Sequence, residues 1–388
     1  MNKRIFCSLV LGAAVFAAGF IVNAADKAPA VKKPAETDRK VPGFPKLENP
    51  QSWTMVVVPD VQTYIKQIEN QGILDMMLSW IARRSGEMKI RQVLFTGDLV
   101  YSNDMNVVEQ EPGVRFERGG RLRDLIADEQ WKAFSRLMER LDGVVPYVLC
   151  TGNHDYGRAS AENRRSYFRR FFPTDRNPLT RRQLVACALN AWGETTLETS
   201  AYEFTAPYPD NRKFLVITLP FAPTDDDLRW AKSIADQPRY AEHIGIVLTH
   251  SYILGNGKRL SVENYALSRA GGNAGEGIYQ KLVYPSKNIR MVVCGHVCKA
   301  DDWNSSVGFS WAENIAGKKV AQMVFNTQAI GGGFSGSGGD GWLRLLEFMP
   351  DGKTVKARTY SPFFGGSPST QHLAWKQDER NEFSFVLD

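Results

Sequence analysis

Five short polar motifs follow apolar, strand-like runs of the sequence. Asp, Asn, Gln and His dominate these motifs, and their side chains carry the oxygen and nitrogen donors that suit Mn, Fe, Zn or Mg. The chain has only five histidines, and three of them end such runs. The pattern therefore predicts a metal site. The motifs are Pro59-Asp60-Val61-Gln62, Gly97-Asp98, Gly152-Asn153-His154-Asp155, Thr249-His250 and Gly295-His296-Val297-Cys298.

Strand ends are where such a site is expected. In an open α/β sheet, ligands bind beyond the carboxyl ends of the strands. A neighbouring glycine or proline lets the chain turn sharply off the strand. A carboxylate such as Asp98 can bridge two cations, and two ions about 3.5–4 Å apart can hold a hydroxide and clamp a phosphoryl group. One Gly-Asp or Thr-His is ordinary turn chemistry, but five motifs in order argue for one shared site.

The elements that must position these motifs alternate between strands and helices. Amphipathic helices are predicted over 68–84 and 124–141, and Thr224 followed by three aspartates is typical of a helix N-cap. This alternation predicts an α/β layered fold. The late runs 320–326, 343–348 and 354–360 lack intervening helices and are expected to form an antiparallel set closing one edge. The earlier strands are predicted over 55–58, 92–95, 144–149, 214–219, 244–248 and 290–293.

The N-terminal segment 1–24 resembles a secretory signal. Lys3 and Arg4 precede an apolar run over 5–22, and small or slim residues follow at 22–24. Cleavage there predicts an exported protein, periplasmic or secreted, without stable membrane insertion. An uncleaved anchor is the alternative, because the run approaches the ~20 residues that a spanning helix needs. No later stretch is apolar enough to span a bilayer.

Four regions follow from composition. Residues 25–50, rich in Ala, Lys and Pro, are expected to be a flexible linker. A catalytic domain is expected over 51–363, with an arginine-rich insertion over 156–199 lying above the sheet. A C-terminal extension over 364–388 is expected to pack on this domain.

Net charge and cysteine content give little information about partners or disulfides. The formal net charge of +6 is modest for 388 residues and does not by itself argue for nucleic acid as a partner. A domain of this size does not need disulfides. Cys150 and Cys294 lie in apolar runs and are expected to be buried free thiols.

The order of the motifs resembles the calcineurin-like metallophosphoesterases. The resemblance runs from Trp53 to about Pro362. Within the family, the sequence looks closest to a bacterial, exported branch that opens with Pro-Asp-x-Gln. That branch ends with a Gly-Gly-x-Gly-Trp-Leu-Arg stretch, found here over 338–344. The resemblance implies a four-layer α/β/β/α sandwich of two mixed β-sheets flanked by helices. It also implies two divalent metal ions.

The resemblance also implies roles for individual residues. Asp98 would bridge both ions, and Asn153, His250 and His296 would complete one site, whereas Asp60 and Gln62 would serve the other. His154 would contact the substrate and protonate the leaving group. Asp155 would orient His154.

Two departures fall on the second metal site. Cys298 stands where the family usually has histidine, and Gln62 stands where many members have histidine. Cys298 is either a softer ligand or a packing residue, and in the second case Asp301 and Asp302 are possible substitutes.

Three further features are candidate parts of the site. The spacing from Asp98 to Tyr101 resembles purple acid phosphatases, where the tyrosine binds ferric iron, and a packing role is the alternative. Tyr101 is also a candidate for binding substrate. Arg158 follows the third motif and could bind substrate phosphate, whereas most arginines of the insertion are expected on a solvated face. The glycine run over 331–341 is expected to be a mobile loop near the site.

The sequence therefore predicts a metal-dependent phosphoric-ester hydrolase, either a phosphatase or a phosphodiesterase, in which a hydroxide bridging the two metals attacks phosphorus. Its partner would be a phosphorylated small molecule or another phosphoester. One alternative keeps the fold as a degenerate binding module for a phosphorylated extracellular ligand, without two bound ions. Another is an exported nuclease, which would bind DNA with a steep salt dependence. The sequence does not separate monoesters from diesters.

Overall fold

The computed structural model describes residues 43–105 and 125–387. The expected signal segment 1–24 and most of the expected linker lie outside the described residues. In the described ranges, no helix combines the length and the apolar character needed to cross a bilayer.

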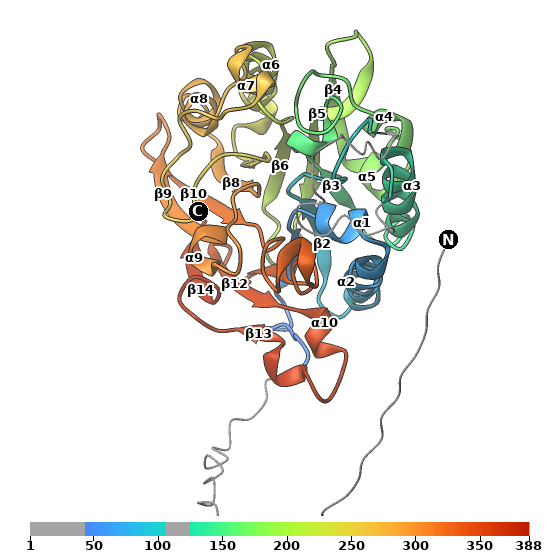
Figure 1. Ribbon diagram of the computed structural model, residues 1–388. Coiled ribbons are helices and arrows are strands. Elements are labelled where there is room, and N and C mark those ends of the chain that lie inside the picture. Colours follow the sequence, from blue (N-terminus) through green and yellow to red (C-terminus); the bar gives the residue numbers. More distant parts are fainter. Residues whose placement is uncertain (1–42, 106–124, 388) are drawn as a thin grey trace, which may run out of the picture. The chain divides into compact units, whose positions relative to one another are not determined.

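Two seven-stranded sheets form the centre of the described fold (Figure 1). In the first sheet, β1, β2 and β3 are parallel and β11 pairs antiparallel with β1. Its path runs β13-β12-β11-β1-β2-β3, with β14 paired to β12. The strands are β1 (Trp53–Val58), β2 (Ile90–Phe95), β3 (Tyr147–Leu149), β11 (Leu343–Phe348), β12 (Thr354–Tyr360), β13 (Trp375–Lys376) and β14 (Phe383–Val386).

The second sheet runs β4-β5-β6-β7-β8-β10-β9. Its four central strands β6, β7, β8 and β10 are parallel, and antiparallel strands flank them. The strands are β4 (Leu184–Leu189), β5 (Thr195–Thr205), β6 (Lys213–Thr218), β7 (Ile244–Leu248), β8 (Ile289–Cys294), β9 (Val307–Glu313) and β10 (Lys319–Phe325).

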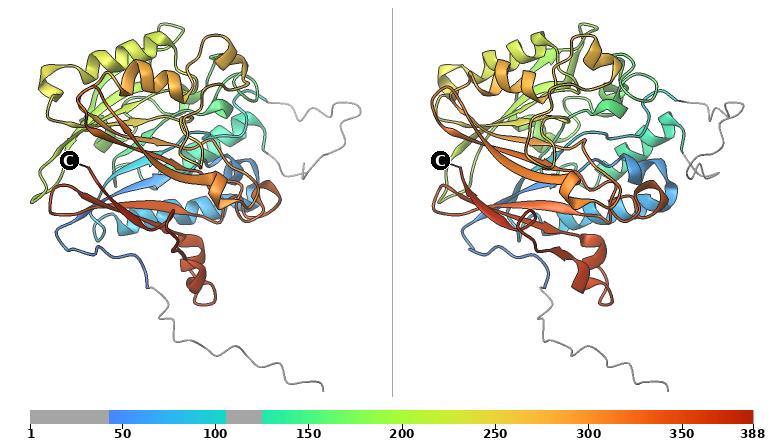
Figure 2. Two further views of the ribbon diagram at one scale, coloured as in Figure 1. Left: turned by 90° about the vertical axis from the view of Figure 1, so that its left-hand side faces the viewer. Right: turned by 60° about the vertical axis from the view of Figure 1, so that its left-hand side comes forward.

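Helices cover the outer face of each sheet (Figures 1 and 2). The longer helices α2 and α3 lie against the first sheet, and α6 lies against the second. Thr224 caps α6 as expected, because its hydroxyl accepts from the Asp227 N–H at 3.2 Å. The helices are α1 (Gln62–Lys66), α2 (Gln71–Arg84), α3 (Ala127–Met138), α4 (Phe168–Phe171), α5 (Pro178–Gln183), α6 (Asp225–Ala235), α7 (Ala266–Arg269), α8 (Gly275–Ile278), α9 (Trp303–Ser306) and α10 (Pro362–Gly365).

Alternate residues of one strand enter different cores. In β1, Val56 and Val58 pack with α2 and α3, whereas Met55 and Val57 pack between the two sheets. A third core lies between the second sheet and α6. Both faces of each sheet are therefore buried, which explains the nearly continuous apolar strands. The predicted four-layer α/β/β/α fold is confirmed.

Three parts of the predicted organisation differ from the structure. The late strands do not close one edge together: β10 pairs in parallel with β8 in the second sheet, whereas β11 and β12 extend the first. The last part of the expected insertion, 184–199, is not an addition above the sheet, because it forms β4 and the start of β5. The last residues of the expected linker also join the domain, because the Glu48 N–H donates to Glu347 at 2.7 Å.

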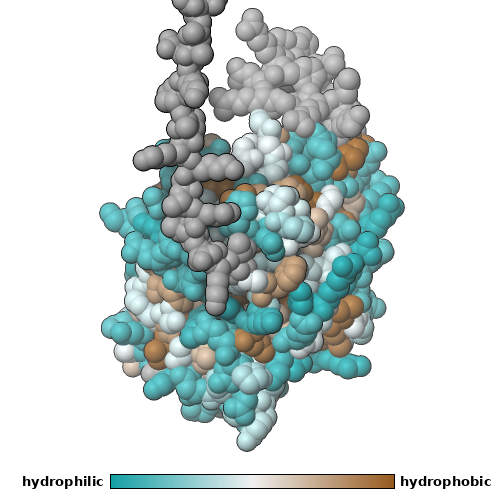
Figure 3. Space-filling model, turned by 90° about the horizontal axis from the view of Figure 1, so that it is seen from below, coloured by the Kyte–Doolittle hydropathy of each residue, from teal (hydrophilic) through white to brown (hydrophobic). Residues whose placement is uncertain are grey.

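The glycine run over 331–341 lies against α1 and the segment after it. Side chains there donate to its carbonyl groups, as Thr63 does to Gly338 at 2.6 Å and Gln67 does to Phe334 at 2.6 Å. These contacts attach the loop to the first sheet's side of the molecule. On the face seen in Figure 3, hydrophobic residues are scattered among hydrophilic ones.

Candidate metal centre

The predicted site residues come from the strand ends of both sheets. Asp98 and Asn153 follow β2 and β3 of the first sheet, whereas His250 and His296 follow β7 and β8 of the second. Asp60 follows β1. The described fold therefore brings predicted site residues 236 positions apart into contact, as in the His296–Asp60 pair.

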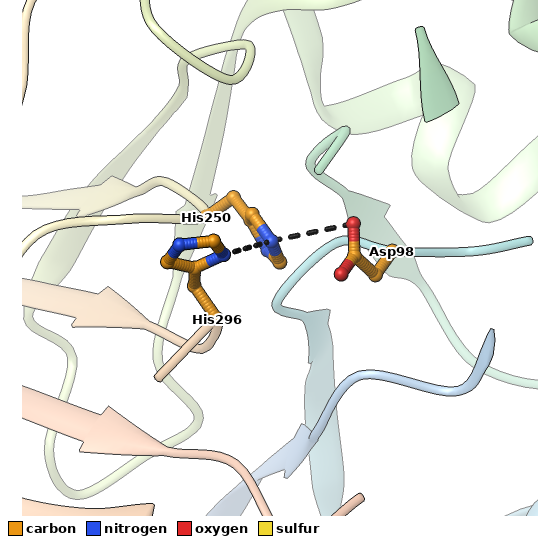
Figure 4. Close-up of side chains that lie close together, drawn as sticks. All are labelled: Asp98, His250 and His296. Carbon is orange, nitrogen blue, oxygen red and sulfur yellow. Dashed lines mark hydrogen bonds and ion pairs between the residues drawn. The ribbon is translucent and has the colours of Figure 1, made fainter. Parts of the chain in front are cut away.

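Four ligand atoms face one another at this junction, and Figure 4 draws three of the residues that carry them, Asp98, His250 and His296. The Nε2 atom of His250 lies 3.3 Å from Asp98 Oδ1, 3.0 Å from Asn153 Oδ1 and 3.1 Å from His296 Nδ1. Ligand atoms of Asp98, His250 and His296 all lie within 4.8 Å of one another. Asp98, Asn153 and His250 are almost wholly buried, and His296 is partly exposed.

Hydrogen bonds on the far side of each group fix which atoms face inward. His250 Nδ1 lies 2.8 Å from the Thr96 carbonyl oxygen, which can only accept, so Nδ1 carries the hydrogen. Asn153 donates its Nδ2–H to Ser160 Oγ at 2.8 Å, which turns its carbonyl oxygen toward His250. The lone pairs of both residues therefore point toward the same space.

Backbone strain accompanies this arrangement. Asp98 has φ 47° and His296 has φ 69°, both in the left-handed region that side chains rarely adopt. Each such residue costs on the order of 1–3 kcal/mol, and such residues cluster at functional sites.

The electrostatics show that the centre needs positive charge. Burial raises the pKa of Asp60 to about 7, with the neighbouring His250 opposing the rise. Burial acts the same way on Asp98, but the nearby histidines outweigh it and hold its pKa well below the usual range. Burial alone would lower the pKa of His250, yet the carboxylates of Asp98 and Asp60 raise it to about 10.

This donor set fits a divalent transition metal. One carboxylate, one amide oxygen and two imidazole nitrogens are ligands that Zn, Fe or Mn accept. The ligand atoms lie about as far apart as ligands of one ion do. His250 and Asn153 are each oriented by a hydrogen bond on the side away from the ion, to Thr96 and Ser160 respectively. Asp98, Asn153, His250 and His296 would hold the ion.

The second predicted position has a different character. Asp60 accepts hydrogen bonds from Thr96 Oγ1 at 2.8 Å, the His296 N–H at 3.0 Å and Asn326 Nδ2 at 2.8 Å. Gln62 donates its Nε2–H to Gln328 at 2.5 Å, and Gln328 donates to Cys298 Sγ at 3.4 Å.

Two observations bear on the donors at this second position. The Gln62 Oε1 atom is buried and has no hydrogen-bond partner among the described residues, so it remains a possible ligand. Burial raises the pKa of Cys298 to about 11, which favours the thiol over the thiolate that binds metal.

His154 lies beside the four donors with a defined orientation. Its Nδ1 is 2.6 Å from the Tyr101 carbonyl oxygen, so Nδ1 carries a hydrogen and Nε2 is the atom left for a substrate. The backbone N–H of His154 donates to Asp98 Oδ1 at 3.0 Å. The ring of Tyr101 stacks on it at 5.1 Å, and the ammonium of Lys66 lies over Tyr101 at 3.8 Å. Tyr101 thus packs on His154, and its binding of iron or substrate stays a prediction.

The role implied for Asp155 differs from its contacts. Its carboxylate accepts from three backbone N–H groups, those of Leu99 at 2.9 Å, Val100 at 3.1 Å and Gly152 at 2.7 Å. It therefore braces the turns that carry Asp98 and Asn153, while the Tyr101 carbonyl orients His154.

The remaining sequence candidates lie away from the donors or are used elsewhere. Arg158 is exposed, and its N–H donates to Glu162 at 2.9 Å, so its contact with a substrate stays a prediction. Asp302 caps α9 through the Asn304 N–H at 3.0 Å. Asp301 is exposed and accepts from the Gly332 N–H at 3.2 Å.

Three residues of the site were missed in the sequence. Asn326 and Gln328 follow β10, so the strand-end signal that found the other motifs could have found them. Glu263, which contacts His296, lies in a loop after β7 and carries no such signal.

Comparison with known proteins agrees with this geometry. The sequence model of a family described as calcineurin-like phosphoesterase matches residues 54–300. The chain is also 24% identical over 341 residues to the uncharacterized protein YvnB of Bacillus subtilis (strain 168), a match that covers 87% of this chain and 22% of the relative. This chain thus spans less than a quarter of that relative's length.

Two solved structures are similar to this chain at low sequence identity. One is GAP50, the anchor in the inner membrane complex of Plasmodium, with 11% identity, a TM-score of 0.40 and coverage of 85% of this chain and 91% of that one. The other is a dimetal phosphatase from Danio rerio, with 12% identity, a TM-score of 0.45 and coverage of 88% of this chain and 100% of that one.

The family match spans more than half of the chain and contains all five polar motifs. It also contains the four donors that converge in the structure. The chain belongs to the calcineurin-like phosphoesterase family.

Proposed function

We propose that this protein hydrolyses phosphoric esters at the metal centre. The observation that carries the proposal is the convergence of Asp98, Asn153, His250 and His296 on one point, with His154 beside it. Divalent ions held by these residues would activate a water as nucleophile and would offset the charge of the phosphoryl oxygens. The protein supplies fixed ligands and a positioned acid.

His154 is the proposed acid for the leaving group. Its Nδ1–H is held by the Tyr101 carbonyl at 2.6 Å, so an added proton resides on Nε2, the nitrogen available to a substrate. A histidine in this position donates that proton to the departing oxygen and stabilises its charge. The stack on Tyr101 holds the ring in place without using either nitrogen.

The two metal positions are expected to differ in affinity. The first has four protein donors turned inward, whereas the second has Asp60, the amide oxygen of Gln62 and a protonated Cys298. Neutral amides and thiols attract a cation less than imidazole and carboxylate do. We therefore expect the second ion to bind more weakly and to exchange more readily.

Activity with defined substrates tests the proposal. The protein is loaded with Mn²⁺ or Zn²⁺, and hydrolysis of 4-nitrophenyl phosphate and bis(4-nitrophenyl) phosphate is followed with and without a chelator. Turnover should vanish with the chelator, and His250→Ala should lower kcat/KM at least about 100-fold through loss of metal-assisted catalysis. Absence of hydrolysis with both ester classes, at proven metal occupancy, would favour the binding module instead.

His154→Asn separates the acid from the ligands. With an alkyl phosphate, whose leaving group needs a proton, the loss in kcat should be about 10²–10⁴-fold. With 4-nitrophenyl phosphate, whose leaving group is stable as an anion, the loss should be much smaller. Metal content should be unchanged. Equal losses for both substrates would contradict the assignment.

Export is part of the proposal and rests on residues 1–24. A substrate outside the cytoplasm follows from it. The test is the N-terminal residue of protein recovered from the periplasm or medium, which should be Ala25 or lie close to it. Recovery of an intact N-terminus from a membrane fraction would support the uncleaved anchor.

A further inference from the structure

Glu263 contacts the candidate ligand His296 from outside the ring of donors. We propose that Glu263 is a positioning residue that fixes the tautomer and orientation of His296 and so strengthens ion binding at the first position. This inference rests on the proposed metal centre but not on the substrate or the reaction.

The contacts of Glu263 are short and buried. Its Oε1 lies 2.9 Å from His296 Nε2 and accepts a second hydrogen bond from Ser251 Oγ at 2.6 Å. Glu263 is only 8% exposed. Its Oε2 is buried without a hydrogen-bond partner among the described residues, so both hydrogen bonds of this carboxylate go to Oε1. Holding a carboxylate in such a place costs free energy, which is typical of a residue kept for function.

The hydrogen bond decides which nitrogen of His296 can bind metal. An ionised carboxylate only accepts, so Nε2 carries the hydrogen and Nδ1 keeps its lone pair. That Nδ1 is the atom 3.1 Å from His250 Nε2 in Figure 4. Without Glu263, the ring could carry its hydrogen on Nδ1 or turn by 180° about its Cβ–Cγ bond, which would put a carbon atom in the place of each nitrogen, and either change would remove a ligand.

The two histidines are oriented by different means. His250 bonds the Thr96 carbonyl through Nδ1 and presents Nε2, whereas His296 bonds a carboxylate through Nε2 and presents Nδ1. A carboxylate behind a ligating imidazole also raises its basicity, and loss of such a partner typically lowers metal affinity. His296 needs this support more than His250 does, because it is partly exposed whereas His250 is fully buried.

Packing alone does not select the nitrogen. The rings of Phe221 and Tyr265 lie near His296, each with its centroid 5.8 Å away. Such contacts limit where the ring lies, but a ring turned by 180° about its Cβ–Cγ bond would keep nearly the same shape. The hydrogen bond to Glu263 supplies the missing distinction.

The test measures metal affinity in three variants of the full chain. Competition with a coloured chelator gives the affinity for Co²⁺ or Mn²⁺ in Glu263→Ala, Glu263→Gln and the matched control Glu198→Gln. Glu198 is another buried glutamate, 7% exposed, that accepts from Tyr156 at 2.6 Å. Glu263→Ala should weaken binding about 10- to 100-fold, Glu263→Gln should weaken it less because the amide oxygen still accepts, and the control should bind as wild type.

A spectroscopic signature separates positioning from general damage. The long-range ¹H–¹⁵N spectrum of the histidine side chains should show His296 protonated on Nε2 in the Zn²⁺-loaded wild type and a changed pattern in Glu263→Ala. If Glu263→Ala does not fold, Glu263→Gln and Ser251→Ala provide the same measurement.

Unchanged affinity and an unchanged His296 signature in a folded Glu263 variant would overturn the proposal. That failure would leave the hydrolase proposal intact. A wild-type protein that binds ions but hydrolyses no ester would contradict the hydrolase proposal without affecting the role proposed for Glu263.

Discussion

At the scale of residues, the centre is defined by lone pairs that oppose one another. Asn153 Oδ1, Asp98 Oδ1 and His296 Nδ1 all lie within 3.3 Å of His250 Nε2. Such an arrangement is stable only with positive charge between the atoms, either a proton or a cation. Protons and metal ions therefore compete for the same place.

This competition predicts how metal affinity depends on pH. Asp98 and Asp60 overcome burial and raise the pKa of His250 to about 10, so in the metal-free protein Nε2 holds a proton below that pH. A metal ion must displace it, so affinity should rise with pH, about tenfold per unit for one proton. Burial also raises the pKa of Asp60 to about 7, so the slope should steepen below pH 7.

Calorimetry in buffers of different ionisation enthalpy measures the protons released per ion. At pH 8 the release should be roughly one proton, the one displaced from His250. An affinity that does not change between pH 7.5 and 9.5 would contradict the charge state assigned to His250.

The sequence predicts most of these residues but not their support. Asp60, Asp98, Asn153, His250 and His296 share the signal of a polar residue after an apolar strand. The partner of His296 comes from an irregular loop, where spacing carries no information about what lies nearby. The contacts of Asp155 differ from its implied role for a similar reason, because backbone N–H groups as partners leave no trace in a sequence.

At the scale of elements, the motif glycines act partly through space and not only through turns. Gly97 has φ 107°, which suits the expected sharp turn. Gly152 and Gly295 have no such φ, yet an added Cβ would lie 2.2 Å from Asp98 Oδ1 or 2.1 Å from Asp60 Oδ1. These glycines let one strand end approach the carboxylate of another.

Gly295→Ala should therefore damage the centre. The new methyl group must displace Asp60, which we expect to cost about 1–3 kcal/mol of stability as overpacking and to weaken metal binding. Gly72→Ala is the control, because a Cβ at that α2 position meets nothing within 4 Å. The control should gain about 0.4–1 kcal/mol. Chemical unfolding measures both, and equal stability of the two variants would contradict this reading.

The late strands show that sequence patterns do not predict which sheet a strand joins. Residues 320–326 and 343–348 have similar apolar composition, yet one strand joins the second sheet and the other the first. Periodicity predicts that a strand exists and which residues alternate, but pairing is set by contacts distant in sequence. The alternation of strands and helices predicts the α/β layered fold, but it does not predict which sheet each late strand joins.

At the scale of the whole molecule, the centre depends on the two sheets keeping their relative position, because its ligands come from both. Arg344 of β11 lies in the buried space between them. Its Nε donates to Thr359 at 3.0 Å, its Nη2 donates to Asn381 at 3.3 Å, and its guanidinium lies 4.7 Å from the ring of Phe325 on β10. One fork-shaped side chain thus contacts both sheets.

Arg344→Lys should destabilise the protein although it keeps the charge. A lysine ammonium cannot reach the same acceptors, and each buried group left without a partner costs about 1–3 kcal/mol. Arg91→Lys on β2 is exposed and should change stability by less than about 0.5 kcal/mol. Urea unfolding of the metal-free variants measures the difference, and a silent Arg344→Lys would show that this contact does not hold the sheets together.

The most direct measurement of the central claim is the number of metal ions bound per chain after loading and desalting, compared between wild type, His250→Ala and Asn153→Ala. The convergence of four donors predicts at least one retained ion in the wild type and its loss in His250→Ala. Asn153→Ala should retain it more weakly. A wild type that retains no ion under any loading condition, or a His250→Ala variant that retains as many as wild type, would contradict the account.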